Sequence, residues 1–155
     1  MKNFFLFIIA VVALSACRNQ GDVFNEYIAL PNVGWDKDSL AVFHPDMKST
    51  GERYNVWLQL RNQSNYSYSN LWLFVDIVAP DGKSVRDTID CQLARPDGEW
   101  IGDGWGSLYS LQIPLMRSVS FNQVGTYTYK FCQAMREQDL EGIHSIGLRI
   151  EKSNK

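Results

Sequence analysis

Hydrophobic and polar positions alternate along most of the chain beyond residue 22. Residues 54–61 read YNVWLQLR, with an apolar side chain at every second position on one phase. A repeat of two residues places successive side chains on opposite faces of a β-strand, so this segment predicts a strand with one buried face. Residues 71–78, LWLFVDIV, are apolar on both phases except at Asp76. They predict a central strand that is covered on both faces.

Turn signals separate these segments. Pro80-Asp81-Gly82-Lys83 predicts a tight turn, because proline fixes φ, aspartate accepts a hydrogen bond from the backbone ahead of it, and glycine adopts positive φ. A return strand over 84–93 would complete a hairpin. A second Pro-Asp-Gly turn at 96–99 opens a glycine-rich loop. Further strands are expected at 23–30, 40–43, 109–121, 127–131 and 146–150.

Two positions interrupt this strand pattern. Pro114 cannot donate a backbone hydrogen bond, so the strand that contains it should carry a bulge or lie at an edge. Residues 133–141 are the one helical candidate, with Gly142 as its stop. Seven or eight short strands with turns between them and hardly any helix predict an all-β fold, an antiparallel β-sandwich of immunoglobulin-like or jelly-roll-like type.

The first residues are expected to be an export signal. A short basic start, Met1-Lys2-Asn3, precedes eleven apolar residues at 4–14. At about 1.5 Å per residue this run is too short for a bilayer core of about 30 Å, and it is typical of a signal peptide. Residues 14–17, LSAC, resemble a bacterial lipobox. We therefore expect cleavage before Cys17 and acylation of its thiol; the alternative is a plain secretory signal with an incidental cysteine.

These expectations divide the chain into a signal peptide (1–16), a lipid-anchored tether (17–22) and a single domain (23–155). Two or three acyl chains hold a protein on a membrane effectively permanently. Residues 18–22 lack the aspartate directly after the cysteine that in some bacteria retains lipoproteins at the inner membrane. They also lack the dense acidic cluster that marks surface export in Bacteroidetes. The expected location is therefore the periplasmic face of the outer membrane.

Composition narrows the possible partners. The chain has 155 residues, of which 45% are hydrophobic and 21% charged, as in one globular domain. The 15 Lys and Arg residues against 17 Asp and Glu give a net charge of −2. This balance provides no basic surface for a phosphate backbone, so nucleic acid is not expected as a partner.

Familiar catalytic and metal-binding motifs are missing. The chain has two histidines and lacks the HExxH, GxSxG and SxxK patterns. Asp97, Glu99 and Asp103 are close in sequence, but their spacing does not match a calcium loop, and a solvated acidic turn is favoured. We therefore expect no catalytic residue, no metal, no cofactor and no small-molecule substrate, although two carboxylates from distant strands could still form a glycosidase pair.

Cys91 and Cys132 would meet an oxidising compartment after export, which permits a disulfide. Their phases argue against it, because Cys91 shares a phase with Ile89 and Leu93, whereas Cys132 lies opposite Phe131. A disulfide is therefore the less favoured possibility, and two free thiols, one buried and one near the surface, the more favoured one.

Aromatic residues cluster in two segments that are candidates for partner binding. The first contains Tyr66, Tyr68 and Asn70, and the second is the 100–107 loop with Trp100 and Trp105. Tyrosine and tryptophan dominate binding hot spots, and loops often carry function. We predict that these five residues contact a partner; the alternative is that the aromatics plug the end of the sandwich.

Several segments together suggest a family. They are the lipobox, Leu60-Arg61-Asn62, residues 66–74, Pro80-Asp81-Gly82 followed by Asp87-Thr88, Leu93-Ala94, residues 98–102 (GEWIG), Gly106-Ser107, residues 133–136 (QAMR) and residues 146–152 (IGLRIEK). In this order they resemble the gliding motility lipoprotein GldH family of Bacteroidetes.

The resemblance implies a small, non-enzymatic envelope lipoprotein that is an accessory or structural component of the gliding machinery, which also serves type IX secretion. Its implied partners are the membrane, through the lipid anchor, and other envelope motility or secretion proteins. The family supplies no catalytic residues. The alternative is a carbohydrate-binding outer-membrane lipoprotein of a polysaccharide-uptake system, since such proteins are also small β-sandwiches with exposed aromatics.

Overall fold

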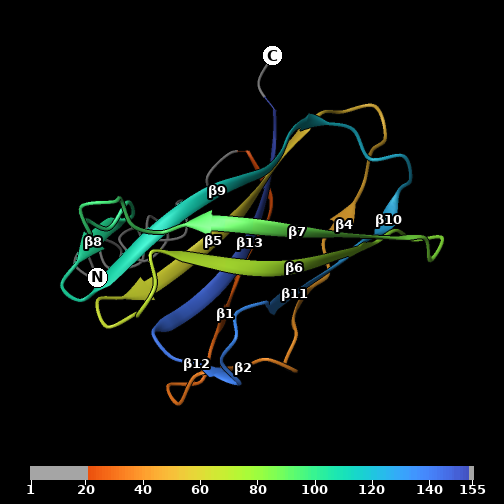
Figure 1. The fold of residues 1–155 in the computed structure, drawn as a ribbon. Helices are drawn as coiled ribbons and strands as arrows, with labels where there is room; N and C mark the ends of the chain where they lie inside the picture. The colour runs from red at the N-terminus through yellow and green to blue at the C-terminus, as the bar shows by residue number, and fades with distance from the viewer. Residues whose placement is uncertain (1–20, 154–155) are drawn as a thin grey trace, which may run out of the picture.

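The computed structural model describes residues 21–153, and Figure 1 shows the arrangement of its strands. The expected signal peptide and Cys17 lie outside the described residues. This part of the chain forms thirteen strands and no helix. The strands are β1 (Asp22–Ala29), β2 (Trp35–Asp36), β3 (Ala41–Phe43), β4 (Asp46–Met47), β5 (Tyr54–Gln63), β6 (Asn70–Val78), β7 (Ser84–Gln92), β8 (Asp103–Trp105), β9 (Leu108–Val119), β10 (Gly125–Thr126), β11 (Thr128–Gln133), β12 (Asp139–Leu140) and β13 (Ile143–Lys152).

Two main antiparallel sheets make up the fold. One has the order β1-β13-β5-β9-β8 and the other β3-β11-β6-β7, with the small pairs β10-β4 and β12-β2 beside them. Both sheets contribute to one hydrophobic core, in which Phe24 of β1 stands edge-on to Phe43 of β3 with ring centroids 6.4 Å apart. The prediction of an all-β sandwich is confirmed. The strand count is higher than predicted, although seven strands have six or more residues.

The alternating segment 54–61 forms β5, as predicted. Val56 and Leu58 are fully buried and Leu60 is 1% exposed. Each fully buried side chain of this kind contributes about 1.5–3 kcal/mol through the hydrophobic effect. β5 lies between β13 and β9, so it forms the centre of the larger sheet.

β6 is central in the four-stranded sheet, but only one of its faces is covered. Leu71, Leu73 and Val75 are buried, whereas Trp72 is 41% and Phe74 is 42% exposed. The expectation of cover on both faces was wrong, because the larger sheet packs on one side of β6 only.

The helix expected over 133–141 was also wrong. β11 continues to Gln133, and β12 begins at Asp139. The buried Gln133 side chain donates from Nε2 to the carbonyl oxygen of Glu137 (2.8 Å) and accepts from the backbone N–H of Met135 (2.8 Å). These side-chain bonds close a loop and replace the backbone hydrogen bonds of a helix.

Pro114 lies in β9 beside an irregularity, as predicted. The register with β5 shifts between Val56 and Trp57, where Trp57 pairs with Pro114. β8 pairs only with residues 108–110 of β9. The proline therefore stands both at a bulge and on an unpaired edge, where its missing N–H costs no ladder bond.

The larger sheet has two distinct ends (Figure 1). At one end Lys152 N donates to the carbonyl oxygen of Gly21 (3.1 Å), Lys152 pairs with Tyr54, and Tyr54 pairs with Val119. We call this the tether end, because the described chain enters β1 here. The turn between β8 and β9 lies at the opposite end of β9, the hairpin end.

Candidate partner-binding surfaces

Tyr66, one of the predicted partner-binding residues, lies in the core. It is 4% exposed, and its hydroxyl donates to the carbonyl oxygen of Asn70 (2.8 Å). Gly142 packs on its backbone so closely that a β-carbon on Gly142 would stand 2.7 Å from the Tyr66 Cα. Burial raises the pKa of Tyr66 well above its usual range, so the phenol stays a neutral donor. Tyr66 therefore holds its loop in place and does not present its ring at the surface.

Tyr68 and Asn70 lie beside a surface hollow of about 440 Å³. Tyr68 is 36% exposed, and its hydroxyl donates to a carboxylate oxygen of Glu137. This hydrogen bond raises the pKa of Tyr68 and lowers that of Glu137. Asn70 donates from Nδ2 to Asp90 Oδ1 (2.7 Å). Of this predicted segment, these two side chains are the ones available to a partner.

The exposed rings of Trp72 and Phe74 extend this surface along β6. Trp72 is paired in register with Asp90 of β7, and Phe74 with Thr88 of β7 and Cys132 of β11. The outer face of the four-stranded sheet thus carries two aromatic rings next to polar neighbours. Sequence reasoning placed both rings inside the protein.

Asp76 could have identified this face from the sequence. It stands on the same phase as Trp72 and Phe74. Its carboxylate accepts two hydrogen bonds from Arg86, at 2.6 and 2.7 Å, which lower the pKa of Asp76. A charged residue on one phase of an otherwise apolar strand indicates the phase that faces water.

The two tryptophans of the 100–107 loop have different environments. Trp100 is half-buried, and its ring centroid lies 6.5 Å from that of Tyr66 and 5.7 Å from that of Tyr109. Trp105 is 91% exposed at the end of β8. Gly106 follows it with a φ of +63°, which permits the tight turn into β9. Trp100 thus plugs the hairpin end, while Trp105 projects from it.

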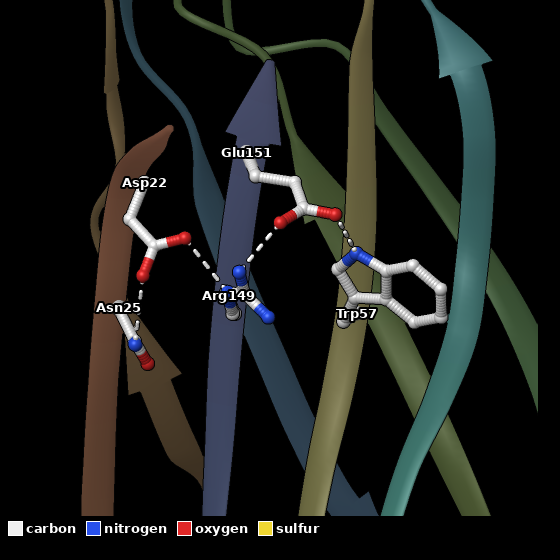
Figure 2. A network of polar contacts seen from close by, with 5 residues as sticks. All are labelled: Asp22, Asn25, Trp57, Arg149 and Glu151. Carbon is white, nitrogen blue, oxygen red and sulfur yellow. Dashed lines mark hydrogen bonds and ion pairs between the residues drawn. The ribbon is translucent and has the colours of Figure 1, made fainter. Parts of the chain in front are cut away.

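A network of polar contacts crosses the outer face of the larger sheet (Figure 2). Arg149 of β13 donates from Nε to Asp22 of β1 (2.7 Å) and from an Nη atom to Glu151 (2.6 Å). Trp57 of β5 donates from Nε1 to the other oxygen of Glu151 (3.0 Å), and Asn25 donates to Asp22 (3.2 Å). The network joins three neighbouring strands through side chains, so its first role is structural.

The cysteines lie on opposite faces of the four-stranded sheet. Cys91 of β7 pairs with the buried Leu71, whereas Cys132 of β11 pairs with the exposed Phe74. β6 separates them by two strand spacings, about 10 Å, and their β6 partners lie three residues apart, about another 10 Å along the strand. Their Cα atoms are therefore about 14 Å apart, which is too far for a disulfide. Both are free in the structure, with Cys91 buried and Cys132 half-buried.

The acidic turn at 97–103 shows ordinary loop contacts. The backbone N–H of Glu99 donates to Asp97 Oδ1 (3.0 Å), and Glu99 pairs with Arg95 (2.5 Å). Within residues 21–153 no group of three or more His, Cys, Asp or Glu side chains is placed to hold a metal ion. In the same range, no helix is long and apolar enough to cross a membrane.

A protein family and two relatives match nearly the whole chain. The GldH lipoprotein family matches residues 22–150. The gliding motility lipoprotein GldH homolog of Christiangramia forsetii is 36% identical over 97% of this chain and 95% of that protein. The gliding motility lipoprotein GldH of Flavobacterium johnsoniae is 32% identical over 99% of both chains. Among solved structures, CBM35 from Cellvibrio japonicus Abf62 covers 86% of this chain and 91% of its own, with 15% identity and a TM-score of 0.37, which is too low to support an inference.

Proposed function

The chain belongs to the GldH lipoprotein family, and we propose that it is a non-enzymatic, lipid-anchored envelope component that serves gliding motility. In this proposal Cys17 carries the acyl chains, residues 17–22 form the tether, and residues 23–155 form one domain that faces the periplasm from the outer membrane. Its role is accessory or structural, in association with the machinery of type IX secretion. The names of the relatives and the lipobox support the proposal.

The exposure of Trp105 is the observation that supports a docking role. A tryptophan that is 91% exposed leaves almost its whole ring in water. Such a ring has about 150–250 Å² to bury in a partner, and tryptophan is among the residues most enriched in binding hot spots. The hairpin pairs Trp105 with Leu108, so the backbone that carries the ring is part of a β-ladder. Little backbone entropy is then lost when a partner covers it.

In this proposal the tether end of the sandwich is anchored to the membrane, and the hairpin end binds the partner. β9 runs for twelve residues from the hairpin end to the tether end. At about 3.3 Å per residue these ends are about 40 Å apart. An anchor just before Gly21 would therefore hold the tether end at the bilayer and present Trp105 to proteins deeper in the periplasm.

The test is an affinity pull-down of the full lipidated protein from its own membranes after mild crosslinking, read by mass spectrometry. We expect the wild type to recover other envelope motility or secretion proteins. Trp105→Ala should reduce that recovery about 30-fold, which corresponds to the loss of a hot spot of 2 kcal/mol. Its free energy of unfolding should change by less than about 0.5 kcal/mol, because the side chain makes few contacts in the folded domain.

Trp100→Ala is the matched control, since it removes the same side chain five residues earlier from a half-buried position. It should lower the melting temperature. If Trp105→Ala lowers it equally, Trp105 is part of the core and the docking role is wrong. Recovery of outer-membrane glycan transporters alone would favour the carbohydrate-binding alternative.

A further inference from the structure

An apolar groove opens between the two sheets at the tether end. It has a volume of about 560 Å³, and its walls include Ile77 and Val85 from the β6–β7 hairpin and Met116, Val119 and Phe121 from the end of β9 and beyond. Val85 pairs with Ile77 on the face of β7 that points toward the other sheet, yet it is 68% exposed. The inner faces of the two sheets therefore do not close on each other here.

The groove lies within reach of the tether. The carbonyl oxygen of Gly21 accepts a hydrogen bond from the backbone N–H of Lys152. Lys152 pairs with Tyr54 on the next strand, and Tyr54 pairs with Val119 in the groove wall. The step from β1 to β9 crosses three strand spacings, which amount to about 14 Å. Three residues lie between Cys17 and Gly21. The four Cα-to-Cα steps from one to the other span up to about 14 Å when extended.

We propose that this groove holds one acyl chain of the lipid anchor carried by Cys17. The inference rests on the proposed lipidation of that residue. Aliphatic and aromatic walls suit a hydrocarbon chain, and a methionine adapts its shape to an irregular guest. At the mouth, Lys83 and Asp81 form an ion pair (3.1 Å). A polar mouth above an apolar interior matches the polar linkage and the hydrocarbon of an acylated cysteine.

An acyl chain bound in the groove would also fix the orientation of the domain on the membrane. A tether of a few residues leaves the domain free to rotate above the bilayer. An acyl chain that is packed between the sheets fixes the tether end against the membrane and so fixes the direction in which the hairpin end points.

The test uses a photocrosslinker placed at the groove. Val85→Cys in a Cys132→Ser background is labelled with benzophenone maleimide, and the full lipidated protein is reconstituted in vesicles of phosphatidylethanolamine and phosphatidylglycerol. Thr88→Cys in the same background is the control, because it stands three residues away on the outer face of the same strand, paired with Phe74. After irradiation, mass spectrometry identifies what is joined to each label.

We expect an intramolecular adduct between residue 85 and the acyl chain of the Cys17 peptide, at least tenfold more abundant than the adduct from residue 88. Adducts with vesicle phospholipid alone, equal yields at both positions, or no lipid adduct would each overturn the inference. The intact mass separates this failure from that of the proposed function. A lipidated Cys17 without the adduct refutes only the groove, whereas an unmodified Cys17 refutes the anchor itself.

Discussion

Alanine at Gly142 should destabilise the domain far more than alanine at Gly82. The two glycines have nearly the same left-handed backbone, with φ of +86° and +85°. Their surroundings differ. A β-carbon on Gly82 would meet nothing within 4 Å, whereas one on Gly142 would stand 2.7 Å from Tyr66 Cα and 2.9 Å from Tyr66 N. The pair therefore separates the cost of backbone strain from the cost of crowding.

The expected magnitudes follow from these contacts. A left-handed backbone costs a residue with a β-carbon about 1–2 kcal/mol, and both variants carry this cost. At Gly142 the crowded atoms belong to backbone, which cannot turn aside as a side-chain end can. Overpacking of this kind adds about 1–3 kcal/mol. We expect losses of about 1–2 kcal/mol for Gly82→Ala and about 2–5 kcal/mol for Gly142→Ala.

The assay is urea unfolding of each variant, followed by tryptophan fluorescence. In thermal melts, 1 kcal/mol corresponds to about 3–5 °C for a domain of this size. Equal losses in the two variants would show that the Tyr66 loop moves aside without cost, and the steric argument would then be wrong. A larger loss at Gly82 would contradict the backbone argument as well.

Three further expectations concern charge and thiol chemistry. Arg149→Met should lower the free energy of unfolding in urea by about 1–3 kcal/mol, because it leaves the largely buried carboxylates of Asp22 and Glu151 facing each other. An unchanged free energy of unfolding would show that the network of Figure 2 adds nothing to stability. Hydrogen bonds from Gln123 and Lys83 lower the pKa of Asp81 to about 2. The contribution of this carboxylate is therefore complete above about pH 4 and is lost as the pH falls through about 2, so Asp81→Asn should flatten the acid side of the stability curve; an unchanged slope would contradict this. Apart from Cys17, the unreduced, unfolded protein should titrate two free thiols, whereas in the folded protein Cys132 should react first, because burial raises the pKa of Cys91 to about 12; a count of zero would show a disulfide.

Periodicity predicted those strands in which one phase is apolar and the other polar. In β5 the sequence itself shows which side is buried, and the structure agrees. In β6 both phases are apolar except at Asp76, so a single charged residue was the one local signal that this phase faces water. The exposure of Trp72 and Phe74 is set by the absence of a second layer on that side, which an apolar pattern alone does not show.

The candidate site was predictable only in part, for a related reason. The sequence showed where aromatic residues cluster, but it could not show that Trp105 is exposed and Trp100 half-buried. The difference depends on Tyr66 and Tyr109, which lie about 34 and 9 residues from Trp100 in sequence but stack near it in space. The predicted helix failed because the long-range burial of Gln133 outweighed a weak local preference.

The position of β13 determines when the domain can fold. This last strand lies between β1 and β5, and it pairs Glu151 with Asp22 across 129 residues of sequence. Contacts of such separation form slowly, and the larger sheet cannot be completed until the last strand has arrived. Until β13 is present, β1 therefore lacks the strand with which it pairs, and its apolar side chains have no neighbour in the sheet. Removal of residues 143–152 would take away the strand that joins β1 to β5, so a chain truncated before residue 143 should not complete the larger sheet.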